Sequence, residues 1–414
     1  MRRFRGEGPK TAMRLTYIIG VKPISSGLGG HHRSLGALVE CMMRHGHPCH
    51  IVTITRTIDS PVLRDLSCPQ DIVSFAPHRP LRFLRTLRRA VSASAPDVVH
   101  CFDLESFFHS FNAGIPHRYP AVFSKCGGPT YRRAHPVPND VVLFSAEDLR
   151  WFQGRPQYAA TRFHHIPNRV APVPGDPGKC AEIRALAGGR KTILRVCRIG
   201  AAHEQSIRAG AELVGRLRRA GLEVVLVVVG AIERPEIFQR LVCDLGDSVV
   251  FLTEERYCRQ GAALLEAGDL VYGTGRGFME GACLGRPLLA PVANSRCPVL
   301  ATEADFDRLL QCNFSARAVV SPLDEEANLR DIVLCLTDRS VWENKSAESL
   351  DWYRRFFSIE AAYERYFAVY RGARPMAYRL SQQVHCLACA AYLHLLQGIR
   401  LGRSPGARAR EALV

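Results

Sequence analysis

The sequence predicts an α/β protein made of two successive Rossmann-like halves, and three observations support this fold class. The chain has 414 residues, enough for two or three domains of about 150 residues each. Short apolar runs alternate with stretches of helical spacing along most of its length. A stretch rich in Pro, Gly and small residues, 171–190, separates this alternation into two parts. We therefore expect an N-terminal domain over 13–170, a linker over 171–190 and a C-terminal domain over 191–357.

The N-terminal half opens with a βαβ unit. An apolar run over 15–21 fits a buried strand, a loop of small residues follows, and residues 32–45 have helical spacing of apolar side chains up to Gly46. Residues 50–54 then form the second strand. Further elements of this half are expected as a helix over 81–93 and as strands over 97–102, 121–125 and 141–145.

The C-terminal half repeats the alternation. Its clearest element is 223–229, where five of the seven residues are valine, as is typical of a strand buried on both faces of a parallel sheet. The other strands are expected over 192–199, 248–252, 270–272 and 287–290, and the helices over 204–220, 235–245, 260–267 and 278–284. Because ligands bind at the carboxyl ends of strands in such sheets, we expect the site in a central cleft that the two halves face.

The segments outside the two halves differ from them in composition. Residues 1–12 are basic, contain Gly and Pro, and are expected to be disordered. Residues 351–370 carry aromatic side chains at near-helical spacing, which predicts core packing and a closing helix over 358–372. The remaining residues, 373–414, form a basic tail.

The charge of the chain favours anionic partners. Lys and Arg number 55 against 39 Asp and Glu, which gives a net charge of +16. No helix-turn-helix, RNP-like or zinc-finger pattern is visible, so nucleic acid is not an expected partner. The arginines over 79–89 and those flanking 384–401 fit either an anionic membrane surface or a solvated outer face. No apolar run reaches the ~18 residues of a spanning helix.

The cysteines indicate a reducing compartment. The chain has 15 of them, scattered without a disulfide framework. Cys386 and Cys389 form a CxxC pair, but no second pair supports a zinc site. The cluster over 45–50 lies where a turn enters a strand, so we expect no metal there. No signal peptide is visible after Met1, and we expect a cytoplasmic protein, peripheral at the inner face of the membrane.

A glycine-rich segment in the second half has the pattern of a phosphate site. Residues 273–277 read Gly-Thr-Gly-Arg-Gly and stand between an expected strand and an expected helix. The free amides at a helix N-terminus bind phosphate oxygens without a side chain. Glu280, in the first turn, can accept hydrogen bonds from ribose hydroxyls. The alternative is a glycine-rich turn with a surface glutamate.

Two other segments can bind anions. Arg198 follows an expected strand at its carboxyl end, where a guanidinium can hold a diphosphate and stabilise a leaving group. The alternative is an arginine in a surface ion pair. Gly29 and Gly30, followed by His31, form the first βα turn and fit a phosphate or sugar cradle.

These motifs, in this order, resemble those of retaining glycosyltransferases of the GT-B fold in family four. The resemblance covers roughly residues 13–371. It rests on Gly29-Gly30, Gly46-His47, Asp97-Val-Val-His100, Ile166-Pro-Asn168-Arg-Val, Arg198, the run from Glu280 to Pro287, and Phe357-Ser-Ile-Glu with Tyr370.

The resemblance implies that a sugar is transferred with retention from a nucleotide diphosphate sugar to a glycan or lipid-linked acceptor. No metal and no cofactor beyond the nucleotide sugar are then expected. The second half would hold the donor, with Glu280 on the ribose and with Arg198 and the amides near Gly275, Arg276 and Gly277 on the diphosphate. His203 would also face the diphosphate, so Arg198, His203 and Glu280 are the expected catalytic residues. The acceptor side would be lined by Gly29, Gly30, His31, His100 and Asp103.

The sequence departs from the family pattern at four polar positions. His203 stands where the family has Lys, and Tyr272 stands at the first of its paired carboxylates. Phe102 and Cys126 replace histidines. Two other functions therefore stay open, a nucleotide-sugar epimerase of the same fold and a non-catalytic binding protein. Arg276 is a candidate to supply the charge of the missing Lys.

Overall fold

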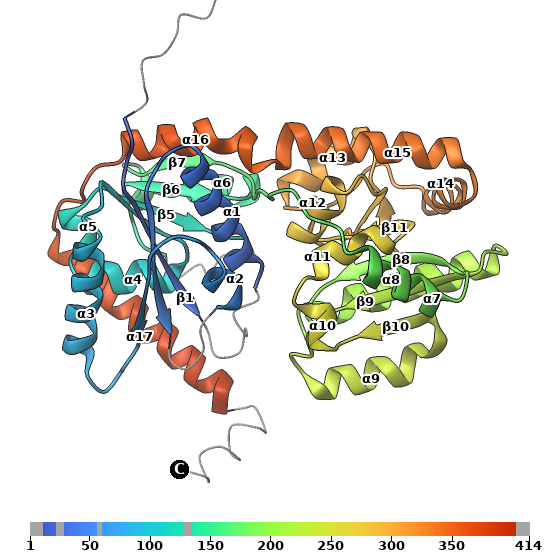
Figure 1. Cartoon of the computed structure of the whole chain (residues 1–414), viewed down its shortest axis with the longest axis horizontal. Coiled ribbons are helices and arrows are strands. Elements are labelled where there is room, and N and C mark those ends of the chain that lie inside the picture. The colour runs from blue at the N-terminus through green and yellow to red at the C-terminus, as the bar shows by residue number, and fades with distance from the viewer. Residues whose placement is uncertain (1–10, 22–28, 56–59, 128–134, 403–414) are drawn as a thin grey trace, which may run out of the picture. The chain divides into compact units, whose positions relative to one another are not determined.

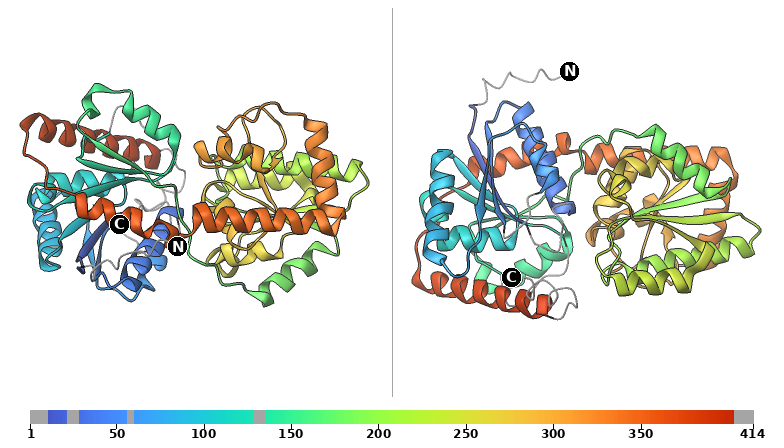
Figure 2. Two further views of the ribbon diagram at one scale, coloured as in Figure 1. Left: turned by 90° about the horizontal axis from the view of Figure 1, so that it is seen from above. Right: turned by 60° about the horizontal axis from the view of Figure 1, so that its bottom comes forward.

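The computed structural model describes residues 11–21, 29–55, 60–127 and 135–402 (Figure 1). The chain divides into two compact units. The first comprises Met1–Leu143, Trp151–His164 and Tyr363–Val414, and the second comprises Phe144–Arg150 and His165–Ala362. Each unit contains a largely parallel sheet with helices on both faces, as the two views in Figure 2 show. The α/β fold with two Rossmann-like units is therefore confirmed.

The sheet of the first unit has seven strands among the described residues, in the order β3-β2-β1-β4-β5-β6-β7. β1 lies between β2 and β4 and is parallel to both, with Leu15 opposite Cys49 and Val98. The strands are β1 (Leu15–Val21), β2 (Cys49–Thr55), β3 (Gln70–Ser74), β4 (Val98–Cys101), β5 (Ala121–Lys125), β6 (Asp140–Leu143) and β7 (Arg162–His165). The helices between them are α1 (Gly30–Arg44), α2 (Pro61–Arg64), α3 (Pro80–Ala93), α4 (Leu104–Asn112), α5 (Ile115–Arg118) and α6 (Ala146–Gln153), with a 3-10 turn at Pro156–Tyr158.

Two C-terminal helices belong largely to the first unit. α16 (Ile359–Gly372) buries aromatic side chains there, and the hydroxyl of Tyr370 lies 3.3 Å from that of Tyr17 on β1. α17 (Leu380–Gly402) follows and packs against α4. In the part of the chain that the structure describes, no helix is both long and apolar enough to cross a bilayer.

The sheet of the second unit has six described strands, in the order β10-β9-β8-β11-β12-β13. All are parallel except β13, which pairs antiparallel with β12. The strands are β8 (Lys191–Val196), β9 (Val224–Val229), β10 (Val249–Leu252), β11 (Leu270–Tyr272), β12 (Leu288–Ala290) and β13 (Val299–Leu300). The helices are α7 (Pro177–Ala187), α8 (Glu204–Arg219), α9 (Pro235–Leu245), α10 (Glu255–Cys258), α11 (Gly261–Leu264), α12 (Arg276–Cys283), α13 (Glu303–Gln311), α14 (Glu325–Thr337) and α15 (Arg339–Trp352), with 3-10 turns at Gly246–Ser248 and Leu265–Ala267 and a π-helical turn at Tyr353–Phe357.

The stretch expected to be a linker contains a helix. Residues Pro177–Ala187 form α7, whose side chains Cys180 and Ile183 are buried in the core of the second unit. Pro177 is the first helical residue and Gly188 follows the last one in a left-handed conformation. The Pro and Gly residues that indicated a linker are thus boundary residues of a short helix. The leader expected over 1–12 lies outside the described residues except for its last two.

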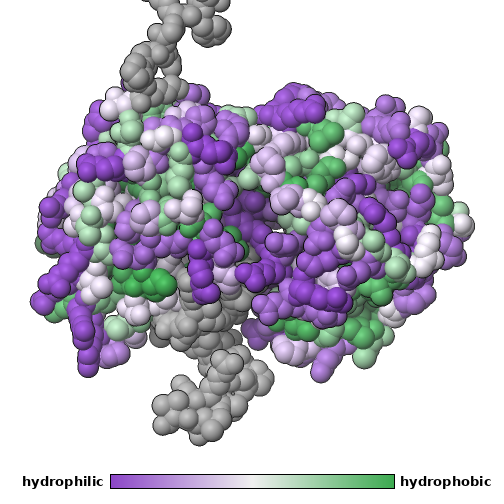
Figure 3. Space-filling view, in the orientation of Figure 1, coloured by the Kyte–Doolittle hydropathy of each residue, from purple (hydrophilic) through white to green (hydrophobic). Residues whose placement is uncertain are grey.

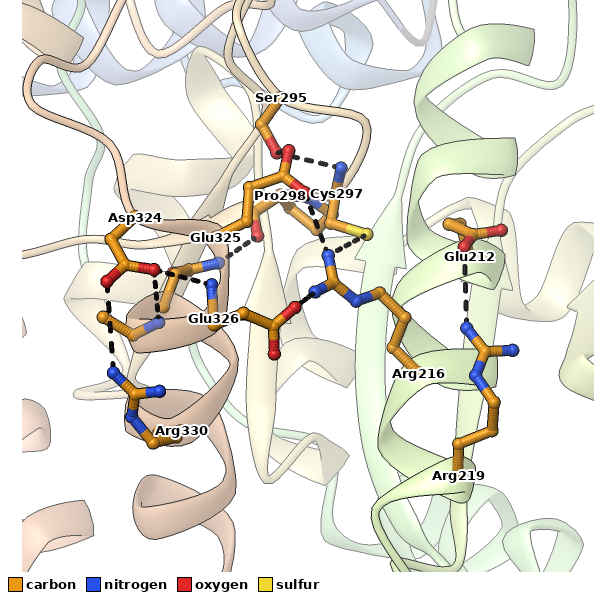
Figure 4. Close-up of polar contacts among 12 residues, drawn as sticks. Glu212, Arg216, Arg219, Ser295, Cys297, Pro298, Asp324, Glu325, Glu326 and Arg330 are labelled. Carbon is orange, nitrogen blue, oxygen red and sulfur yellow. Dashed lines mark hydrogen bonds and ion pairs between the residues drawn. The ribbon is translucent and has the colours of Figure 1, made fainter.

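Ion pairs fasten the helices of the second unit to one another. Arg216 on α8 donates to Glu325 at 3.1 Å and also to Glu326 on α14 (Figure 4). Glu325 in turn accepts from the hydroxyl of Ser295, and this hydrogen bond is the largest of the causes that lower the pKa of Glu325.

The exterior is mainly hydrophilic on the face that Figure 3 displays, with apolar patches between the charged residues.

Candidate functional site

The glycine-rich motif and Arg198 lie at the same edge of the second sheet. β8 and β11 are neighbouring parallel strands, so the loops that follow them leave from one edge. A Cβ placed on Gly277 would lie 3.7 Å from the carbonyl oxygen of Val196, the last residue of β8. The first turn of α12 therefore lies against the end of β8, and the two motifs that the sequence singles out are neighbours.

Two glycines are required by the geometry of the turn that precedes α12. A Cβ on Gly273 would lie 2.4 Å from the backbone N and Cα of Phe278, closer than real atoms approach. Gly275, the N-cap, has a φ of +51°, which side chains disfavour, and its amide donates to the carbonyl of Asn313 at 3.1 Å. The turn thus brings backbone close to backbone and leaves the N-terminus of α12 at the carboxyl edge of the sheet, where it favours an anion.

Glu280 and Arg276 form an ion pair on α12. The Nε of Arg276 lies 2.6 Å from Oε1 of Glu280, and the two side chains are 14% and 7% exposed. The Nη1 of Arg276 also donates to the carbonyl of Arg169 at 2.9 Å. Arg276 therefore joins α12 to the Ile166–Val170 segment, another of the family-like motifs. A ribose that binds Glu280 has to share its carboxylate with this guanidinium.

Arg198 is held at the surface by a single carboxylate among the described residues. Its Nη1 lies 3.0 Å from Oε1 of Glu233, and its side chain is 47% exposed. The loop that carries it is fixed by backbone hydrogen bonds, because Ile199 donates to Ala231 and Glu233 donates to Ile199. An exposed ion pair is worth about 0–1 kcal/mol, so Arg198 can exchange Glu233 for a diphosphate at little cost.

His203 is neutral at physiological pH. It occupies the N-cap position of α8, and its backbone amide donates to the carbonyl of Gly200. Burial, and then the charges of Arg195 and Arg198, lower the pKa of His203 to about 4. His203 therefore does not supply the positive charge that the family's Lys would supply, although its ring can still form hydrogen bonds.

Arg195 is a functional candidate that the sequence analysis missed. It lies on β8, is 1% exposed, and places its guanidinium 4.2 Å from the ring centroid of Tyr272 on β11. Its Nη2 donates to the hydroxyl of Ser206 at 2.7 Å and its Nη1 to the carbonyl of Tyr272 at 3.4 Å. Within the described residues, no carboxylate forms an ion pair with it. The sequence offered one indication, an arginine inside the apolar run Thr-Ile-Leu-Arg-Val-Cys of 192–197.

The pairing of Arg195 with Tyr272 gives the site a buried positive charge. Burial of a cation without a counter-charge is unfavourable, and the face of an aromatic ring offsets only part of it. Burial also raises the pKa of Tyr272 to about 12, so this hydroxyl stays protonated, and it has no hydrogen-bond partner among the described residues. The uncompensated charge lies on the strand that ends just before Arg198, where it favours a bound anion.

Two of the residues expected on the acceptor side have structural roles in the first unit. His100 is 1% exposed, and its ring nitrogens lie 2.8 Å from the hydroxyls of Tyr370 and Ser124. Burial lowers its pKa to about 3. Asp103 caps α4 by accepting from the amide of Ser106 at 2.7 Å, and it also accepts from the amide of Gly20 at 2.6 Å. His100 therefore lies in the core and not on an open surface, and both of its ring nitrogens have hydrogen-bond partners within the fold.

The other expected acceptor-side residues begin α1. Gly29 is its N-cap and Gly30 its first residue. His31 is partly exposed and its ring lies 3.9 Å from that of His32, which is buried. Burial, and then the neighbouring His31, lower the pKa of His32 to about 3. The N-terminus of α1 thus carries the partly exposed ring of His31 next to the buried, neutral ring of His32.

Comparisons with known proteins agree with the fold. No model of a known protein family matches the sequence, and no curated protein matches it in sequence. Among solved structures it is similar to Alr3699/HepE of Anabaena in complex with UDP and glucose, with a TM-score of 0.62 and 15% identity over 87% of this chain and 100% of that chain. It is also similar to the sucrose-phosphate synthase of Thermosynechococcus elongatus, with a TM-score of 0.58 and 16% identity over 87% of this chain and 98% of that chain.

A third neighbour is WaaG, a glycosyltransferase involved in lipopolysaccharide biosynthesis. Its TM-score is 0.52 and its identity 17%, over 86% of this chain and 98% of that chain. At these identities the likeness establishes the fold and not the activity. The fold is the GT-B fold of glycosyltransferases, with two Rossmann-like units.

Proposed function

We propose that the protein is a glycosyltransferase that uses a nucleotide diphosphate sugar. The observation that carries the proposal is that the N-terminus of α12 lies beside the end of β8, two residues before Arg198, with Glu280 in the second turn of the same helix. Each offers a chemistry that such a donor needs, namely amides for phosphate, a guanidinium for a diphosphate and a carboxylate for a ribose. The similarity to HepE, whose structure holds UDP and glucose, supports the same class of ligand.

The proposed mechanism assigns a role to each group. The N-terminal turn of α12 binds the diphosphate through its positive end and through amides other than those of Gly275 and Gly277, which donate to the carbonyls of Asn313 and Thr274. Arg198 leaves Glu233 to neutralise the charge that develops on the leaving group. Glu280 orients the ribose, while Arg276 holds its carboxylate in place. His203, neutral, donates a hydrogen bond to a phosphate oxygen. The positive charge of Arg198 and the positive end of α12 take the place of a divalent ion, so transfer is proposed to be metal-independent, with retention as the family resemblance implies.

The acceptor is proposed to be a glycan or a lipid-linked molecule that binds to the first unit. Gly29, Gly30 and His31 are the candidates for direct contact, because they form the accessible N-terminus of α1. His100 and Asp103 would not contact the acceptor, and they would instead hold β4 and α4 in place. The proposed location is the cytoplasm, at the inner face of the membrane, where a lipid-linked acceptor is accessible.

A second candidate function is nucleotide-sugar binding without transfer. Two observations favour it: His203 lacks the charge of the family's Lys, and Glu280 already has a guanidinium partner at 2.6 Å. The two functions share the donor site and differ in turnover. They are therefore distinguished by products and not by affinity.

The test is a binding screen followed by product analysis. A thermal-shift screen of the full chain against nucleoside diphosphates and nucleotide sugars should reveal one class that stabilises it, by about 2.7 kcal/mol at a hundred times Kd. Release of the nucleoside diphosphate with a glycan acceptor identifies a transferase, and an isomerised sugar without acceptor identifies an epimerase. Stabilisation without any product identifies a binding protein.

The site assignment needs its own variant. Glu280→Gln should weaken donor binding at least ten-fold, since the amide is uncharged and replaces one of the two accepting oxygens of the carboxylate by an NH2 donor. Glu212→Gln is the matched control, because Glu212 lies on the exposed side of α8 with only a 3.8 Å contact to Arg219. Equal donor affinity in both variants would remove Glu280 from the site.

A further inference from the structure

α17 carries a ridge of exposed apolar side chains. Leu380, Val384 and Leu387 are 68%, 59% and 51% exposed. Their spacing of four and three residues puts them on one face of the helix. Cys386 and Cys389 lie on the opposite face and are buried against the first unit. α17 is therefore fixed to the protein by one face, while its other face presents apolar surface that the described residues do not cover.

The charged residues near this ridge along the chain all have one sign. Between residues 365 and 410 the sequence has no Asp or Glu, and the eight charged residues in this range are all Arg. Arg371, Arg374 and Arg379 are exposed and precede the ridge. From Leu380 to Ile399 the helix has no charged residue apart from histidine. A partner that fits this face has to accept apolar side chains at its centre and neutralise arginines at its edge.

A second basic surface lies on α3, which packs against α4 as α17 does. Phe83, Leu87 and Val91 of α3 are buried, so its apolar stripe belongs to the core. Its arginines face outward, and no ion pair holds them among the described residues. These exposed side chains are Arg79, Arg82, Arg85, Arg88 and Arg89. α3 thus contributes charge, while α17 contributes apolar surface.

We propose that the first unit docks on an anionic bilayer surface through the Leu380–Val384–Leu387 ridge, with the arginines of α3 and of 371–379 on the lipid headgroups. An interfacial helix buries an apolar face at the boundary of headgroups and acyl chains, and each basic residue near an anionic leaflet strengthens binding by roughly five-fold. A second copy of the chain fits less well, because it would bring two arginine-rich edges together. The inference rests on the proposed function only in that docking would serve a membrane-bound acceptor.

The test is flotation of the full chain with lipid vesicles, without any nucleotide sugar. The chain should float with vesicles of phosphatidylcholine and phosphatidylglycerol, and not with phosphatidylcholine alone. The triple variant L380Q/V384Q/L387Q should bind at least ten-fold more weakly. L186Q/V242Q/L334Q, which changes exposed apolar residues on helices of the second unit, is the matched control and should bind as the wild type does.

Three results would overturn the proposal. They are failure of the wild type to bind anionic vesicles, equal binding by the ridge variant, and a wild-type dimer in sedimentation that the ridge variant dissolves. The quadruple variant R82Q/R85Q/R88Q/R89Q should weaken binding and reduce its dependence on salt. Nucleotide binding by the ridge variant is measured separately, by thermal shift. The ridge and the donor site belong to different units, so loss of vesicle binding with unchanged nucleotide binding concerns the membrane proposal alone, and loss of nucleotide binding by the wild type concerns the proposed function.

Discussion

Replacing Arg195 by Met tests whether the second unit holds an uncompensated charge. Burial of an unpaired cation costs several kcal/mol, roughly 4. The desolvated contact with the ring of Tyr272 returns about 2 kcal/mol and the hydrogen bond to Ser206 about 1.5 kcal/mol. The balance is near zero, so Arg195→Met should leave the free energy of unfolding within about 1 kcal/mol of the wild type, as urea unfolding followed by circular dichroism measures it.

The same substitution should weaken the binding of a nucleoside diphosphate. Loss of one buried positive charge from this edge of the sheet should raise the Kd roughly ten-fold, which corresponds to about 1.4 kcal/mol. Calorimetric titration with UDP measures this change. Arg219→Met, at an exposed position of α8, is the control and should leave the Kd unchanged.

Two results would refute this reasoning. If Arg195→Met lowered the free energy of unfolding by about 3–5 kcal/mol, Arg195 would be part of a compensated structural network. If UDP bound equally well to Arg195→Met and to the wild type, the charge on β8 would play no part in binding anions.

Three further predictions follow from the geometry of single residues. Burial lowers the pKa of His100 to about 3, whereas its pKa in the unfolded chain is about 6.5. As the pH falls, the unfolded chain therefore takes up this proton first. The contribution of His100 to stability should be complete above pH 6.5, and the free energy of unfolding should fall by up to about 1.4 kcal/mol per pH unit below it. Unfolding measured against pH should show a shallower acid limb for His100→Asn than for the wild type, and an unchanged limb for His78→Asn at an exposed position. Gly273→Ala should lower the UDP affinity at least ten-fold, since its Cβ would lie 2.4 Å from backbone atoms of α12, and an unchanged Kd would contradict the proposed turn. Arg198→Ala should change the free energy of unfolding by less than about 1 kcal/mol and still weaken UDP binding at least ten-fold; equal binding would remove Arg198 from the diphosphate site.

The elements of the fold were predictable wherever burial leaves a local pattern. The valines of 224–229 indicate a strand covered on both faces, and all six of its residues are buried. The helix over 204–219 was predicted within a residue, because its apolar side chains recur at helical spacing. α7 was missed because its Pro and Gly residues were interpreted as a linker, although the same residues delimit helices.

The candidate site was predictable only in part. The glycines of 273–277 indicate a tight turn before a helix, and the structure places that turn beside the end of β8. The partner of Glu280 is local, since Arg276 lies one helical turn before it on α12, whereas the partner of Arg198 could not be predicted, because the loop after β9 brings Glu233 to it. His100 follows a strand pattern in the sequence, but its environment depends on Tyr370, which is 270 residues away.

Local patterns suffice to place most of the strands and helices and the glycine-rich turn before α12, since these properties depend on neighbours within a few residues. Tertiary structure decided which charges are compensated. Arg195 and Arg198 are three positions apart on one segment, yet the first lies under Tyr272 without a described carboxylate and the second reaches Glu233 at the surface. The physical reason is that burial and Coulomb interactions depend on distances in space, which sequence separation does not give.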